Sequence, residues 1–126
     1  MAITVWDGSD LDNDFATEAN WDTAAKPVAG DEVIFDGRTT EDCTGSMAHG
    51  NTGNVNFDLI HIKSSFTGDV GVAGAPLHHA ADIVIIEGSG SYYIETSNVD
   101  AASDATTALV IVNNPGRNSI SFGRCE

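Results

Sequence analysis

Four short apolar segments recur along the chain at nearly constant intervals, and this spacing restricts the fold more than any other feature of the sequence. They are rich in β-branched residues, which favour strands, and they span residues 32–35, 59–62, 83–86 and 109–112. Their first apolar residues, Val33, Leu59, Ile83 and Leu109, are separated by 26, 24 and 26 residues. A period of about 20–50 residues is typical of solenoids. The spacing therefore predicts parallel strands stacked about 4.8 Å apart over one shared core.

Weaker strands are expected after the last three segments, at residues 70–72, 92–94 and 119–122, with turns rich in glycine, asparagine and aspartate between them. We therefore predict an all-β protein, a short right-handed parallel β-helix of about four coils. A single domain should span residues 1–126, with 1–31 as an N-terminal cap and 32–126 as the coils. The alternative is a β-sandwich or jelly roll, whose strands would be antiparallel.

The strand segments at 83–86 and 109–112 are apolar at every position. A strand with one face in water should alternate between apolar and polar residues, so the outward side chains are expected to be covered by a loop, the N-terminal segment or another subunit. We accordingly predict a homo-oligomer, specifically a trimer. The side chains assigned to these assembly strands are Leu59, Ile62, Ile83, Ile85, Leu109 and Ile111.

The first 37 residues carry a recognisable pattern. It consists of Trp6-Asp7-Gly8, an acidic stretch, Ala19-Asn20-Trp21, Pro27, Gly30-Asp31 and Val33-Ile34-Phe35. This pattern resembles the entry segment of right-handed β-helix proteins, a group that includes autotransporter-like passenger domains and structural proteins of tailed bacteriophages. The resemblance implies that Trp6 and Trp21 close the top of the helix, and that the Gly-Asp pair leads into a first core strand containing Val33 and Phe35.

Members of that group usually run on for many coils, whereas this chain stops after about four. The start of the chain also lacks the basic and long apolar stretches of a secretory signal. Together with the resemblance, these features favour the phage branch: a capsid decoration or head-associated protein on the virion surface, assembled in the host cytoplasm. A capsid or other virion protein is the expected partner, and an extracellular location is the alternative.

The charge balance excludes two classes of partner. The chain has 5 Lys and Arg residues against 19 Asp and Glu residues, a formal net charge of −14. Such a chain repels nucleic acid phosphates and anionic membranes. No nucleic acid or membrane partner is expected.

An oxygen-rich run near the N-terminus is the one candidate metal site. Asp10, Asp12 and Asp14 imitate the start of a calcium loop, but the sixth position is Phe15 where an EF-hand needs glycine, and the twelfth is Trp21 where it needs glutamate. An EF-hand is therefore excluded. An irregular calcium site and a solvated acidic loop both remain open, and no other cofactor is expected.

No catalytic motif is present: the sequence contains neither a G-x-S-x-G elbow nor a phosphate-binding loop. We predict a protein that is not an enzyme. A carbohydrate-binding or adhesin module that uses Trp21, Tyr92 and Tyr93, with or without calcium, is the alternative function, and a small lyase or hydrolase is the third. The coil order should separate Cys43 from Cys125 by about three coils, too far for a disulfide.

Overall fold

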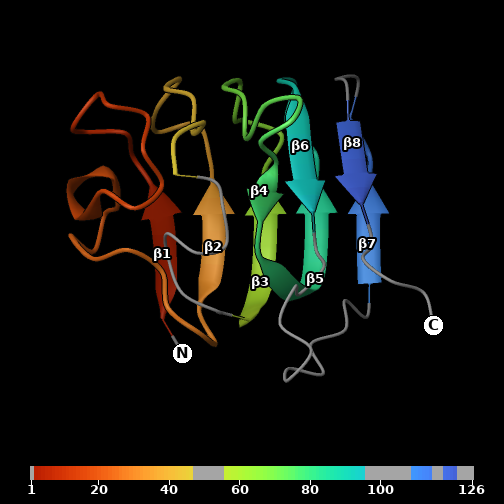
Figure 1. Ribbon diagram of the computed structural model, residues 1–126, viewed down its shortest axis with the longest axis horizontal. Helices are drawn as coiled ribbons and strands as arrows, with labels where there is room; N and C mark the ends of the chain where they lie inside the picture. The colour runs from red at the N-terminus through yellow and green to blue at the C-terminus, as the bar shows by residue number, and fades with distance from the viewer. Residues whose placement is uncertain (1, 47–55, 96–108, 115–117, 122–126) are drawn as a thin grey trace.

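The computed structural model is a parallel β-solenoid, in which strands from successive turns lie side by side (Figure 1). It describes residues 2–46, 56–95, 109–114 and 118–121. Five strands form one sheet in the order β1 (Ile3–Trp6), β2 (Glu32–Phe35), β3 (Asn56–Ile62), β5 (Ala80–Ile86) and β7 (Leu109–Val112). Three form a second sheet in the order β4 (Leu77–His78), β6 (Tyr92–Glu95) and β8 (Asn118–Ser121).

Every strand pair within the two sheets is parallel. The predicted parallel β-helix is therefore confirmed, and the sandwich alternative is wrong. The solenoid has about three turns, where the spacing predicted about four. Among the described residues 36–46, which follow β2, none belongs to a strand of the second sheet. In that turn Cys43 makes only an isolated bridge to Val70.

The strand register corrects one detail of the predicted alignment. Glu32, and not Val33, lies beside Leu59, which in turn lies beside Ile83 and then Leu109. Val33 instead lies beside Ile60. The first step of the solenoid is therefore one residue longer than the apolar pattern indicated, because Glu32 occupies the outward position that Leu59 occupies one turn later.

Inward side chains stack in rows that run the length of the solenoid. One row consists of Thr4, Val33, Ile60, Val84 and Val110, and the next consists of Trp6, Phe35, Ile62, Ile86 and Val112. Leu77 and Ile94 face them from the second sheet and are fully buried. Because each row continues from turn to turn, every turn shares its core with the next.

The N-terminal segment both extends the sheet and closes its end. Strand β1 pairs with β2, and the chain then returns through the short 3-10 helix η1 (Glu18–Asn20). Asp22 covers the free edge of β1: its N–H donates to the Val5 carbonyl at 3.0 Å, and its Oδ1 accepts the Val5 N–H at 2.8 Å. Trp6 and Trp21 meet edge to face, with ring centroids 5.2 Å apart.

The Gly30-Asp31 pair sets the start of β2. Gly30 has a positive φ of 82°, a conformation that glycine adopts without a steric penalty. The Asp31 side chain is buried and accepts the N–H of Ala2 at 3.0 Å and the N–H of Val28 at 2.9 Å. One carboxylate thus joins the beginning of β1 to the turn before β2.

Replacing this carboxylate should destabilise the fold. In Asp31→Ala the N–H groups of Ala2 and Val28 both lose a buried carboxylate acceptor, and each hydrogen bond to a charged group contributes about 1.5–3 kcal/mol. We expect the free energy of unfolding, measured by urea denaturation, to fall by about 2 kcal/mol or more. The exposed Asp10 provides the control, because Asp10→Ala should leave it almost unchanged. Equal losses in the two variants would contradict the role assigned to Asp31.

Candidate functional site

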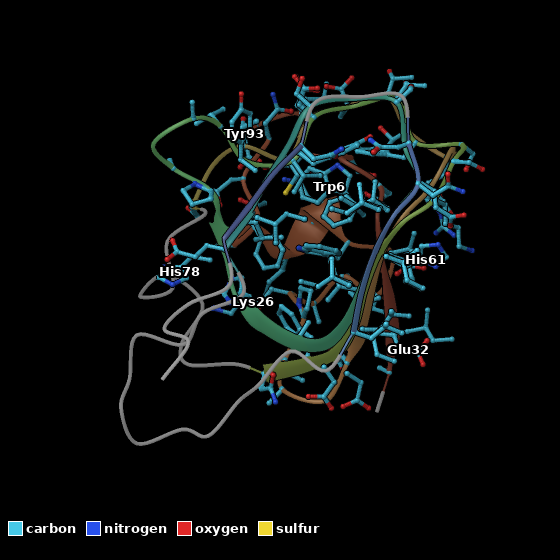
Figure 2. The ribbon with its side chains drawn as sticks, turned by 90° about the vertical axis from the view of Figure 1, so that its right-hand side faces the viewer. Trp6, Lys26, Glu32, His61, His78 and Tyr93 are labelled. Carbon is cyan, nitrogen blue, oxygen red and sulfur yellow. The ribbon has the colours of Figure 1, made fainter. Side chains whose placement is uncertain are left out.

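The outer side of the five-stranded sheet carries two rows of side chains. The first row is Ile3, Glu32, Leu59, Ile83 and Leu109, and the second is Val5, Ile34, His61, Ile85 and Ile111. Figure 2 shows Glu32 and His61 on the outside of the coil and Trp6 within it. We call Leu59, Ile83, Ile85, Leu109 and Ile111 the outer apolar surface.

In the second row exposure rises toward the last strand, whereas the first row is exposed at both ends, since Ile3 on β1 is 61% exposed. Val5 and Ile34 are buried, whereas Leu109 is 47% exposed and Ile111 is 42% exposed. Leu59, Ile83 and Ile85 are partly exposed. The outer apolar surface therefore presents aliphatic side chains from three adjacent strands, β3, β5 and β7, to the surroundings.

Five of the six residues predicted for the assembly strands belong to this surface, and Ile62 does not. Ile62 lies inside the solenoid between Phe35 and Ile86 and is 0% exposed. Alternation along β3 is the reason, because Ile60 and Ile62 point inward while His61 between them points outward. Ile62 thus stabilises the core and contributes nothing to an external contact.

His61 interrupts the apolar rows with a polar pair. Its Nε2 lies 2.5 Å from Oε1 of Glu87, a residue that follows β5 directly. Both side chains are partly exposed, so the pair is accessible from outside. The His61–Glu87 pair places polar groups, whose contacts depend on direction, beside the aliphatic side chains of the outer apolar surface.

The acidic N-terminal loop uses its carboxylates to organise its own backbone. Asp12 accepts hydrogen bonds from Thr17 Oγ1 at 2.7 Å and from Asn20 Nδ2 at 2.5 Å. Asp14 accepts one from Ser46 Oγ at 2.7 Å. The hydrogen bond from Thr17, followed by that from the Asp14 N–H, lowers the pKa of Asp12. Asp10 contributes its backbone N–H, which donates to Asn20 Oδ1 at 2.8 Å.

These contacts bear on the predicted calcium site. Within the described ranges, no group of three His, Cys, Asp or Glu side chains is arranged to hold a metal ion. The run Asp10, Asp12 and Asp14 is not brought together as a ligand set there. Calcium binding stays a prediction. A solvated acidic loop accounts for the hydrogen bonds of Asp12 and Asp14 without a metal ion.

Other acidic residues cap the turns of the solenoid in the same way. Asp42 Oδ1 accepts the N–H of Asp69 at 2.7 Å, and Asp69 Oδ1 accepts the N–H of Ser91 at 2.7 Å. Each carboxylate thus reaches the turn above it and satisfies a backbone donor at the corner. Part of the high acidic content therefore has a structural purpose.

The aromatic residues considered for sugar binding are mostly inaccessible. Trp6, Trp21 and Tyr92 are buried, and the indole N–H groups of Trp6 and Trp21 donate to the carbonyls of Glu41 and Phe15. Only Tyr93 lies on the outside of the coil (Figure 2). Trp6 and Trp21 pack with Phe35 inside the first turns, so they form part of the core.

Asn20 is an important residue that the sequence indicated only as part of the Ala19-Asn20-Trp21 motif. It is fully buried, its side chain bonds to Asp10, Asp12 and Asp14, and its carbonyl accepts the N–H groups of Asp7 and Gly8. No local pattern in the sequence marks this role, because the burial of the Asn20 amide and its several partners are set by the tertiary structure.

Comparison with family models, with curated proteins and with solved structures gave no significant match. No helix in the described ranges is long and apolar enough to cross a membrane. The function must therefore be argued from the geometry of the chain itself.

The lowered pKa of Asp12 predicts a pH-dependent contribution to stability. Its hydrogen bonds to Thr17 and Asn20 favour the ionised form, so this contribution is complete above the unfolded pKa of about 3.9 and is lost as pH falls through the lower folded pKa. Thr17→Val should therefore destabilise the protein at neutral pH, and its deficit in urea denaturation should shrink below about pH 4. Thr23, which donates to the carbonyl of Ala25, supplies the control. The deficit of Thr23→Val should not follow this pH dependence, and identical pH profiles would refute the assignment.

Cys43 should be unreactive in the folded protein. It is a free thiol in the core, and burial raises its pKa well above the ordinary value, so almost no thiolate is available to attack an alkylating reagent. Because Cys125 lies outside the described residues, the measurement uses Cys125→Ser. Mass spectrometry should detect no iodoacetamide adduct at about pH 8 without denaturant and complete modification in guanidinium chloride. Rapid modification of the folded protein would contradict the burial of Cys43.

Proposed function

We propose that this chain is a non-enzymatic structural protein that acts by assembly, with its outer apolar surface as the contact. The single observation that carries the proposal is the exposure of Leu109 and Ile111, 47% and 42%, in line with Leu59, Ile83 and Ile85 on one face. Contiguous exposed apolar side chains on an otherwise polar protein mark interaction sites. Depletion of charge at their centre is typical of an interface core.

The net charge supports contact through this surface in particular. A chain with a net charge of −14 repels further copies of itself across most of its surface. The five members of the outer apolar surface carry no charge, so contact there avoids much of this repulsion. Burying aliphatic side chains contributes about 25 cal/mol per Å², which favours association where repulsion is weakest.

We further propose that the assembly serves on a phage virion as a capsid decoration or head-associated protein, with three copies as the specific stoichiometry. This step rests on the resemblance of residues 1–37 to the entry segment of β-helix proteins of tailed bacteriophages. The closed first turn, with Trp6 and Trp21 inside it, is compatible with that resemblance. The carbohydrate-binding alternative is less well supported, because two of its three aromatic residues, Trp21 and Tyr92, are buried.

Assembly through this surface can be tested by sedimentation velocity at micromolar concentration. We expect the wild type to sediment as an oligomer, and the double variant Ile83→Thr/Ile85→Thr to have a lower mass, because two aliphatic contacts become polar without a change of charge. Val72→Thr is the matched control, since Val72 is 41% exposed but lies in a loop next to the second sheet. A wild-type monomer, or a double variant with the wild-type mass, would sink the proposal.

A further inference from the structure

The edge strands at the two ends of the solenoid differ in what covers them. At the end formed by β1, Asp22 bonds to both backbone groups of Val5 and covers the strand edge. At the opposite end, β7 and β8 are the last strands of their sheets, and no strand in the described part of the chain pairs with their outer edges (Figure 1). An uncovered edge strand is a template for pairing with another chain.

The backbone of β7 shows which groups this edge presents. The N–H of Asn113 donates to the carbonyl of Ile86 in β5 at 2.9 Å. Backbone groups of successive residues in a strand point to opposite sides, so the N–H and C=O of Val112 point away from β5, and so do those of Val110. The Val112 side chain also remains 46% exposed, although its neighbour Ile86 in the same inward row is fully buried.

The described residues of this edge lack the usual protection against pairing. Proteins commonly place charged residues or proline on edge strands to prevent association. The described residues of the last turn, 109–114 and 118–121, include neither. Along the sequence, 18 of the 19 acidic residues precede residue 105, and only Glu126 follows it.

That charge distribution indicates what covers the edge. Two copies that meet at their β7 ends would keep their acidic N-terminal parts far apart, whereas a head-to-tail contact would place the β7 end against the acidic loop around Asp10, Asp12 and Asp14. The head-to-tail arrangement is also disfavoured because Asp22 already occupies the edge of β1. A symmetric contact between like ends is the commonest way for two copies to associate.

We propose that β7 of one copy pairs antiparallel with β7 of a second copy across a twofold axis, which joins two solenoids end to end. The axis passes beside Ile111, so that the backbone groups of Val110 in each copy bond to those of Val112 in the other. Pairing also buries the exposed side chain of Val112. This contact uses the backbone edge of the sheet and does not depend on the outer apolar surface.

The test removes one edge donor without disturbing the bonds between β7 and β5. Val112→Pro deletes an N–H that points away from β5, and proline is tolerated at such edge positions. Val112→Thr keeps the N–H and the side-chain size and serves as the matched control. Both substitutions are made in the Ile83→Thr/Ile85→Thr background, so that association through the outer apolar surface does not contribute to the mass.

In sedimentation velocity we expect this background to be a dimer, and Val112→Thr to remain one. Val112→Pro should raise the dimer dissociation constant by at least about tenfold. The substitution removes one hydrogen bond from each copy, and therefore two from the symmetric dimer. Circular dichroism and a thermal melt check that the proline variant is folded. If it is not, Val112→Lys replaces it, since an inward-pointing charge on an edge strand also prevents pairing.

A monomeric background, or a folded Val112→Pro or Val112→Lys variant that stays dimeric, would overturn the inference. Hydrogen exchange adds a second criterion: the Val112 amide should be protected in the dimer and exchange rapidly in the monomer. If the Val112 amide is protected in a monomer, other residues of the same chain cover this edge, and the inference is also overturned. If Val112→Pro lowers the mass of the wild-type assembly and Ile83→Thr/Ile85→Thr does not, contact through the outer apolar surface is rejected. Pairing between β7 edges would still stand in that case.

Discussion

The rest of this structure depends on the in-register stacking of inward side chains between successive parallel strands. Each strand of the five-stranded sheet places a residue over its equivalent one turn earlier, so that Val33, Ile60 and Val84 form one continuous row. Backbone hydrogen bonds between turns hold this register, and the buried side chains exclude water from it. No turn could bury its apolar face alone, so the fold is stable only as a stack of turns. The first and last turns each have one neighbour, and their outer ends need another cover.

The acidic residues have two separate roles in this arrangement. Asp31, Asp42 and Asp69 accept backbone N–H groups at turns, and Asp12 and Asp14 do the same within the N-terminal loop. In this way carboxylates replace the strand pairing that corners and loops lack. Their charge also makes most of the surface repulsive toward further copies. The contacts that we propose between copies are formed by uncharged residues, on the outer apolar surface and at the edge of β7.

The two surfaces would give an assembly different properties. The outer apolar surface is made of side chains and can fit a copy of the chain or another protein of a particle with a complementary apolar patch. The edge of β7 is made of backbone groups and requires another strand in a defined direction. Asp22 and the packed tryptophans close the β1 end, so the contact that we propose between strand edges uses the opposite end of the solenoid.

The sequence by itself determined the repeating strands, the parallel stacking and the core positions of Val33 and Phe35, because apolar periodicity is a local property of the chain. The position of Trp6 and Trp21 at the first turn followed from the resemblance of residues 1–37. Five of the six residues that the sequence predicted for the assembly strands lie on the outer side of the sheet. Only the tertiary structure decided that Ile62 points inward, that Glu32 aligns with Leu59, and that Asn20 and Asp31 organise the first turns. These outcomes depend on which face a strand turns toward the core and on which donors lie near each carboxylate. Both are set by contacts between residues far apart in the sequence, such as Trp6 and Glu41 or Phe15 and His79, which no local pattern of residues encodes.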